Sequence, residues 1–178
     1  MKIHYNKYKW ISKRLIIYAI IAMYHYSLGG IFLELKIYEN MLTIASMQEL
    51  RLSCGFPLLD SGMVRTALAR SLLNLSAVVD ERVVGMLRVT GDGVFVFVIC
   101  DVMVHPEYRD RGIASAMVLY SLRCIENMLP SGVLGTVSLF AAKEHVRLYK
   151  RLGFEALPSR DRGPGMQLTV IGRQGEEK

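Results

Sequence analysis

The feature that most constrains the fold is a long apolar segment that leads through a polar loop into a helix-forming segment. Residues 94–104 are almost entirely apolar, which is typical of a strand covered on both faces. A polar loop at 107–112 follows, and the apolar residues of 113–129 then recur at the spacing of an amphipathic helix. A buried strand that continues directly into a helix requires a sheet with that helix packed against it.

The remaining chain alternates between helical and extended patterns. Gly91-Asp92-Gly93 predicts a hairpin turn before the apolar strand, because glycine supplies the positive φ of such turns. We expect helices at 46–53, 61–73, 113–129 and 144–152, and strands at 76–79, 83–90, 94–104, 136–141, 154–157 and 166–171. This order predicts an α+β domain, with a mixed, mostly antiparallel sheet flanked by helices.

Two regions differ in composition, an N-terminal extension at 1–40 and a domain at 41–178. Residues 15–33 form an apolar run behind Lys13-Arg14, long enough to span a bilayer or to act as a signal anchor. The run contains His25 and Gly29-Gly30, so a membrane segment is the least favoured interpretation. It remains open whether the extension is an extra helix packed on the domain or lies upstream of a true start at Met41.

Charge and cysteine content exclude several classes of function. The formal net charge is +6, but residues 1–40 hold six Lys and Arg against two Glu, so the domain itself is nearly balanced. This balance argues against a nucleic-acid-binding surface. Cys54, Cys100 and Cys124 have neither metal-ligand nor disulfide spacing, so we expect no metal and a reducing, cytoplasmic location.

The loop before the long helix has the composition of an anion site. The first amides of a helix lack internal partners and carry the positive end of its dipole, which suits a pyrophosphate. Gly112 and Ala114 keep that backbone open, and Arg109 and Arg111 add cationic donors. The alternative is an ordinary strand–helix connection with solvated arginines.

Residues 109–114 fit the Q/R-x-x-G-x-G/A signature of the Gcn5-related N-acetyltransferases (GNAT), and a Val-x-Val-x-Pro strand end precedes them. The resemblance implies binding of acetyl-CoA, with its pantetheine arm along the strand and its pyrophosphate at the loop. The cofactor-binding residues that it implies are Val102, Met103, Val104, Arg109, Asp110, Arg111, Gly112, Ile113 and Ala114.

A second motif follows downstream, where residues 148–154 resemble the F/L-Y-x-x-x-G-F segment of the same family. The resemblance implies that Tyr149 is the general acid for the departing thiolate. A phenol of pKa near 10 can protonate a thiolate whose conjugate acid has a pKa near 8.5. The alternative is that Tyr149 is a core residue of its helix.

The resemblance extends from about residue 42 to 171 and is closest to a branch with plant and cyanobacterial serotonin-type arylalkylamine acetyltransferases. The segments that carry this are 84–86 with 90–93, 100–102 and 139–141, and 163–166 is similar to bacterial relatives of unknown substrate. Many family members have an asparagine before the tyrosine-bearing helix, but residues 141–144 contain none. The cofactor contacts on that side are therefore open.

The general base is also open. Asp101 is the first candidate, since a carboxylate within an apolar run needs partners or a cleft. A structural hydrogen bond is the equal alternative for it. Glu107, His105 and Asp92 are the further candidates.

The resemblance implies an N-acetyltransferase that transfers the acetyl group of acetyl-CoA to the primary amine of a small molecule by direct attack. Phe95 and Phe97 either line an apolar acceptor pocket or belong to the core. The alternatives are a protein lysine or N-terminal acetyltransferase and a non-catalytic acyl-CoA-binding module. Dimers are common in the family, so a homodimer is a further expectation.

Overall fold

The computed structural model describes residues 27–28, 31–32, 34–157 and 165–171 of the 178-residue chain. Most of the apolar run at 15–33 and the segment 158–164 lie outside the described residues. Within these ranges, the helices are all too short or too polar to cross a membrane.

Most elements lie close to their expected positions. The α-helices are α2 (Ile44–Ser53), α3 (Ser61–Ala69), α4 (Ile113–Met128) and α5 (Val146–Arg151), with short 3₁₀ turns η1 (Pro106–Tyr108) and η2 (Lys143–His145). The strands are β1 (Ser27–Leu28), β2 (Ile31–Phe32), β3 (Lys36–Glu39), β4 (Leu73–Val79), β5 (Arg82–Gly91), β6 (Val96–Val104), β7 (Leu134–Phe140), β8 (Glu155–Leu157) and β9 (Gly165–Ile171).

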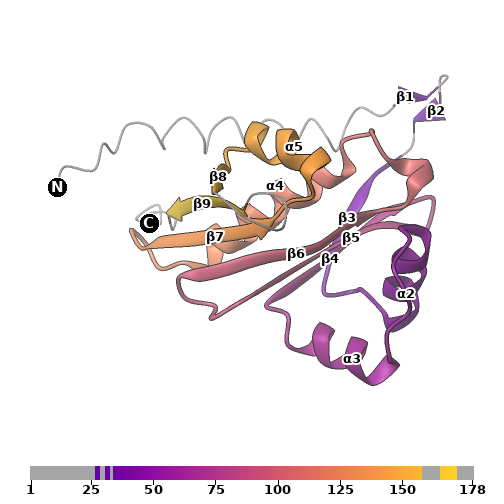
Figure 1. Ribbon diagram of the computed structural model, residues 1–178, viewed down its shortest axis with the longest axis horizontal. Coiled ribbons are helices and arrows are strands. Elements are labelled where there is room, and N and C mark those ends of the chain that lie inside the picture. Colours follow the sequence, from indigo (N-terminus) through magenta and orange to yellow (C-terminus); the bar gives the residue numbers. More distant parts are fainter. Residues whose placement is uncertain (1–26, 29–30, 33, 158–164, 172–178) are drawn as a thin grey trace, which may run out of the picture.

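Seven of these strands form one sheet in the order β3-β4-β5-β6-β7-β9-β8 (Figure 1). All neighbours in it pair antiparallel except β6 and β7, which run parallel. The expected fold class, a mixed and mostly antiparallel sheet flanked by helices, is confirmed. A single parallel pair matters for function, because the carboxyl ends of both strands and the segments that follow them meet at one end of the sheet.

The two faces of the sheet bury separate apolar clusters. On one face, alternate strand residues such as Leu87, Val89 and Phe97 pack with α4 and α5. On the other face, Met86 and Met103 pack with α2 and α3, which lie together at the right of Figure 1. Strand alternation assigns neighbouring residues to opposite clusters.

Close packing of α4 on β5 depends on Gly85. A Cβ at this position would lie 3.1 Å from Met117 Cε and 3.2 Å from Ile113 Cγ2. The missing side chain therefore lets the first turns of α4 rest directly on the sheet. The start of α4 is thereby fixed beside the end of β6.

The turn between β5 and β6 is longer than expected, and β6 begins at Val96 instead of residue 94. Oδ1 of Asp92 accepts hydrogen bonds from the backbone N–H groups of Val94, Phe95 and Val96 at 2.8, 3.0 and 3.0 Å. These bonds hold the first residues of the apolar run in the turn, because a side-chain acceptor competes with the strand for the same donors.

The sheet also includes residues that the sequence analysis assigned to the N-terminal extension. Lys36–Glu39 pairs with β4 as the edge strand β3, and Leu35 is only 4% exposed within the core. The hydroxyl of Tyr120 on α4 donates a 2.8 Å hydrogen bond to Glu39. The folded unit therefore starts before Met41.

Candidate active site

The site begins where β6 and β7 part. Their parallel pairing joins Val96–Ile99 to Thr136–Leu139 and goes no further, although β6 continues to Val104. Beyond Ile99, the edge of β6 that faces β7 has no strand partner among the described residues. An unpaired strand edge presents backbone N–H and C=O groups to an extended ligand.

A β-bulge at Asp101 accompanies this separation. The pairs Met86↔Met103 and Arg88↔Cys100 show that β6 uses one more residue than β5 over this stretch. Asp101 has φ of 50°, a left-handed conformation in which aspartate is tolerated better than most residues. A bulge bends its strand, so it directs the end of β6 away from β7.

Strand alternation shows which backbone groups face the opening, the space between β6 and β7 beside residues 100–104. The N–H of His105 donates to the carbonyl of Val84 at 2.8 Å, so the backbone groups of His105 and Met103 point toward β5. Those of Val104 and Val102 then point the other way, into the opening. The side chain of Met103 is buried in the α2–α3 cluster. Of the three strand residues expected to bind the cofactor, two therefore face the opening and Met103 does not.

The loop after β6 leads to an uncapped helix start. Gly112 is the N-cap of α4 with φ of 73°, and Asp110 is also left-handed, with φ of 59°. No side chain caps the first amides of α4. Because Ile113 points its side chain into the core, only its backbone borders the loop. Uncapped amides at a helix start are suited to an anion, and these lie beside the open edge of β6.

The two arginines of the loop have defined partners. Nε of Arg109 donates to the carbonyl of Val104 at 3.1 Å. The guanidinium carbon of Arg111 lies 5.1 Å from the ring centroid of Tyr108, whose ring contacts His105 edge-on at 5.8 Å between centroids. These contacts place both cations at the end of β6, next to the start of α4.

Tyr149 lies on α5, which follows β7 after a short connection, so α4 and α5 both start from the end of the sheet where the parallel strands finish. Its side chain is 6% exposed and packs edge-on against Phe154, with ring centroids 5.9 Å apart. Desolvation by burial raises the pKa of Tyr149 above its usual value. A tyrosine in this environment stays protonated and can donate a proton.

Comparison with known proteins gives this geometry a family. Residues 73–156 match the family model of the acetyltransferase (GNAT) domain. These residues form a GNAT acetyltransferase domain. The resemblance to the Gcn5-related N-acetyltransferases is thus confirmed, and the matched residues span β4 to β8, which includes the opening, α4 and Tyr149.

Individual relatives agree with the GNAT assignment. GCN5-related N-acetyltransferase 2, chloroplastic, of Arabidopsis thaliana is 38% identical over 84 residues, which are 47% of this chain and 31% of the relative. Serotonin N-acetyltransferase 2, chloroplastic, of Oryza sativa subsp. japonica is 30% identical over 126 residues, 68% of this chain and 61% of the relative. The chain spans about a third of the length of the curated relatives that it matches over 83 or 84 residues.

A solved structure shows the same fold at low identity. An aminoglycoside 6'-N-acetyltransferase complexed with coenzyme A aligns with a TM-score of 0.60 and 16% identity, covering 79% of this chain and 99% of that chain.

Within the GNAT domain, Asp101 has a structural partner. Its Oδ2 atom accepts a hydrogen bond from Nε of Arg88 at 2.7 Å, with the two side chains 23% and 14% exposed. Sequence reasoning left open whether Asp101 is a base or a structural residue, and it did not single out Arg88. A lone arginine within the apolar strand at 83–90 was the available signal, because a buried charge requires a partner.

The other candidate bases differ in position. Asp92 lies in the β5–β6 turn, at the opposite end of β6 from Val104 and roughly 25 Å from that residue along the strand. The side chain of Glu107 is 74% exposed on η1. Nε2 of His105 lies 3.2 Å from Nη2 of Arg82, and its Nδ1 lies 3.4 Å from the N–H of Glu107.

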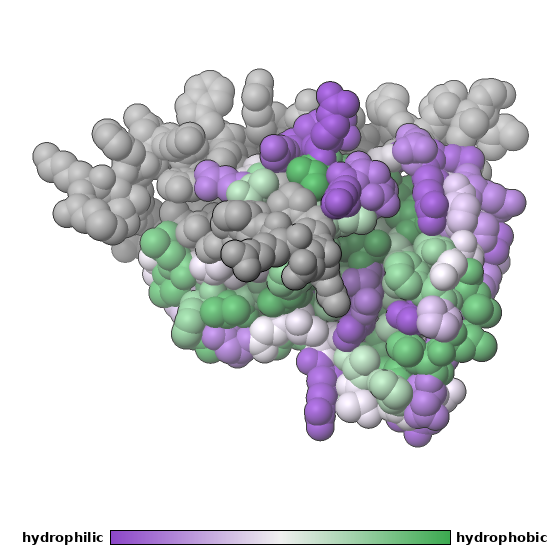
Figure 2. All heavy atoms as spheres, in the orientation of Figure 1, coloured by the Kyte–Doolittle hydropathy of each residue, from purple (hydrophilic) through white to green (hydrophobic). Residues whose placement is uncertain are grey.

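The two phenylalanines do not line the opening. Phe97 is fully buried under α4, on the core face. Phe95 is 55% exposed at the β5–β6 turn with Val94 and Val96, where Figure 2 shows hydrophobic side chains at the lower left. Strand alternation directs Phe97 into the core, and the hydrogen bonds to Asp92 hold Phe95 in the β5–β6 turn. Neither side chain therefore lies at the opening.

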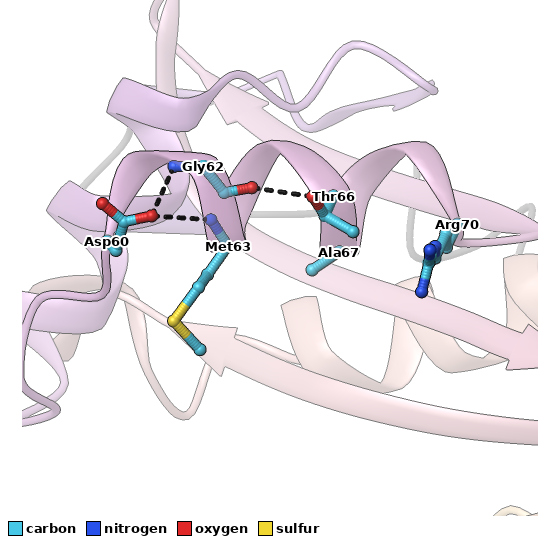
Figure 3. A pocket seen from close by; sticks show the side chains of 6 residues that line it. All are labelled: Asp60, Gly62, Met63, Thr66, Ala67 and Arg70. Atoms are coloured by element: carbon cyan, nitrogen blue, oxygen red, sulfur yellow. Dashed lines mark hydrogen bonds between the residues drawn. The ribbon is translucent and has the colours of Figure 1, made fainter.

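A shallow hollow lies on the outer face of α3 (Figure 3). Two of its polar side chains already bond within the helix: Oδ1 of Asp60 accepts from the N–H groups of Gly62 and Met63, and the Thr66 hydroxyl donates to the Gly62 carbonyl. The hollow brings none of the predicted site residues together, so we do not assign it to the active site.

Proposed function

We propose that the GNAT domain binds acetyl-CoA in the opening between β6 and β7 and transfers the acetyl group to the primary amine of a small molecule. The observation that supports this most is the meeting of two unsatisfied backbone surfaces. The unpaired edge of β6 ends beside the uncapped amides of α4, at the carboxyl end of the parallel pair. An elongated ligand with an amide-bearing arm and a pyrophosphate is complementary to both.

Each surface has a separate role in this proposal. The N–H of Val104 and the backbone groups of Val102 hydrogen-bond the pantetheine arm. The carbonyl of Val104 already accepts from Arg109, so it contributes less. The amides at the start of α4 hold the pyrophosphate, and Arg109 and Arg111 add charge-assisted donors.

Acetyl-CoA supplies an activated thioester that a neutral amine attacks directly. A backbone N–H of the β6 edge polarises the thioester carbonyl. Tyr149 donates its phenolic proton to the departing thiolate, and the raised pKa keeps that proton in place at neutral pH until the transfer. The proton that the attacking nitrogen releases passes to solvent, and solvent restores the phenol of Tyr149. The positioning of the two reactants and one proton donor lowers the barrier further, because the reacting groups are already aligned.

The test is a thermal-shift and calorimetric titration of the full chain with acetyl-CoA, CoA and ATP, followed by a turnover screen. We expect acetyl-CoA and CoA to raise the melting temperature and ATP to leave it unchanged, because only the native state binds the ligand.

The turnover screen monitors release of free CoA thiol with small amines in one arm and lysine-containing or free N-terminal peptides in the other. Preferred turnover of peptides would replace the small-molecule acceptor by a protein acceptor. Binding without turnover in either arm would indicate a non-catalytic module.

A further inference from the structure

The Arg88–Asp101 pair connects two parts of the domain that sequence alone does not relate. Asp101 is the left-handed residue of the bulge in β6. Besides its 2.7 Å bond to Asp101, Arg88 donates from Nη1 to the carbonyl of Ala67 and to the hydroxyl of Ser71, both at 3.0 Å. The hydroxyl of Ser71 in turn donates to the Ala67 carbonyl at 2.8 Å. One guanidinium therefore joins the bulge to the carboxyl end of α3.

This network lies at the point where β6 leaves β7. The last parallel pair is Ile99↔Leu139, two residues before Asp101. Both charged side chains are mostly buried, so water competes little for their hydrogen bonds. Because Arg88 is anchored at three acceptors, it restrains the carboxylate and with it the backbone of the bulge.

We propose that Arg88 and Asp101 are a positioning pair that fixes the bulge. The pair thereby holds apart β6 and β7 at the acetyl-CoA slot, which is the opening between these two strands. This inference rests on the proposed function, since it assigns a role toward the same ligand. It makes Asp101 a residue that shapes the slot, and it excludes Asp101 from proton transfer. It also makes the slot depend on α3, through Ala67 and Ser71.

Four variants of the full chain separate this role from the alternatives. Asp101→Asn keeps an acceptor for Arg88 and tolerates the left-handed conformation. Asp101→Gly keeps the conformation and removes the pair. Arg88→Met removes the pair and leaves a partly buried carboxylate. The double variant Arg88→Met with Asp101→Asn removes that uncompensated charge as well, so it retains the test if the single Arg88 variant fails to fold.

The readouts are CoA affinity by calorimetry, melting temperature, and kcat against KM for acetyl-CoA. Asp101→Gly and the double variant are expected to weaken CoA binding about tenfold, because the slot is no longer pre-organised. Asp101→Asn is expected to bind CoA and to turn over within about threefold of the unmodified chain, with an unchanged pH profile. Leu73→Ala, a core variant in β4, is the control for stability loss: its melting temperature falls while its CoA affinity stays the same.

Two results would overturn the inference. If Asp101→Gly and the double variant bind CoA as the unmodified chain does, the pair only stabilises the fold. If Asp101→Asn binds CoA normally but loses turnover and one limb of its pH profile, Asp101 is the general base. Failure of the unmodified chain to bind CoA would instead refute the proposed function, so the two failures are distinguishable.

Discussion

Nε of Arg109 donates a hydrogen bond to the backbone carbonyl of Val104, 3.1 Å away, and so ties the loop before α4 to the open edge of β6. The same carbonyl lies 3.4 Å from the thiol of Cys54 at the end of α2. The carbonyl is therefore already satisfied by the protein. The hydrogen bond from Arg109 to Val104 links the two halves of the proposed acetyl-CoA site, which are the open edge of β6 and the start of α4.

Replacing Arg109 by methionine should weaken CoA binding about threefold to tenfold, since it removes a cation beside the pyrophosphate site and loosens the loop. Calorimetry at low and high salt measures the effect, and the variant should depend less on salt than the unmodified chain. Arg123→Met, an exposed position further along α4, is the matched control. Equal affinity and equal salt dependence in all three proteins would exclude Arg109 from the site.

Gly112→Asp should abolish detectable CoA binding, because it adds a side chain and a negative charge at the uncapped start of α4. The substitution also imposes strain, since Gly112 has φ of 73°. Gly132→Asp controls for that strain: Gly132 has φ of 76° in the turn between α4 and β7, with open space where a Cβ would lie. A similar loss of binding in both variants would attribute the effect to strain alone.

Tyr149→Phe should lower kcat about 100-fold while the Kd for CoA stays nearly constant, as expected for a residue that acts only on the leaving group. Burial raises the pKa of Tyr149, so its protonated form persists above the usual range. Activity that depends on this proton should fall only as pH rises through that elevated pKa, and the variant should lack this limb. Equal kcat values would make Tyr149 a core residue only.

A chain that begins at Met41 should be less stable than one that begins at Glu34. It lacks Leu35, whose burial contributes about 2 kcal/mol, and the strand β3 that covers the edge of β4. Denaturant unfolding of both chains measures the difference in free energy of unfolding. Identical values would show that β3 adds nothing to the folded unit.

The Tyr120–Glu39 hydrogen bond should make the attachment of β3 sensitive to alkali. Burial, together with the Glu39 carboxylate, raises the pKa of Tyr120 to about 12. Because the folded pKa lies above the ordinary value of about 10, the contribution is complete below about pH 10 and is lost as pH rises toward 12. Tyr120→Phe should lower the free energy of unfolding by a few tenths to about 1 kcal/mol at pH 8. This difference in free energy from the unmodified chain should shrink above pH 10. A difference that does not change with pH would exclude this hydrogen bond as its cause.

The sequence by itself determined the order of the elements from α2 onward and the glycine-bearing loop before α4. The apolar spacing of α4 and the glycine-bearing loop before it are local features, since helix periodicity and left-handed glycine are set within a few residues. The expected helix at 61–73 was too long, because Leu73 begins β4 and pairs with Val89, a contact that no local pattern encodes.

Only the tertiary structure decided which residues of the motif face the site. Alternation along β6, fixed by its register with β5, directs Val102 and Val104 to the opening and Met103 to the core. The partner of Asp101 is Arg88, thirteen residues earlier in the chain, and it is the bulge that brings them into contact. Lys36–Glu39 became a strand because β4 supplied an open edge and Tyr120 an anchor. These outcomes depend on pairing between distant segments, and the energy of such pairs is absent from any local stretch of sequence.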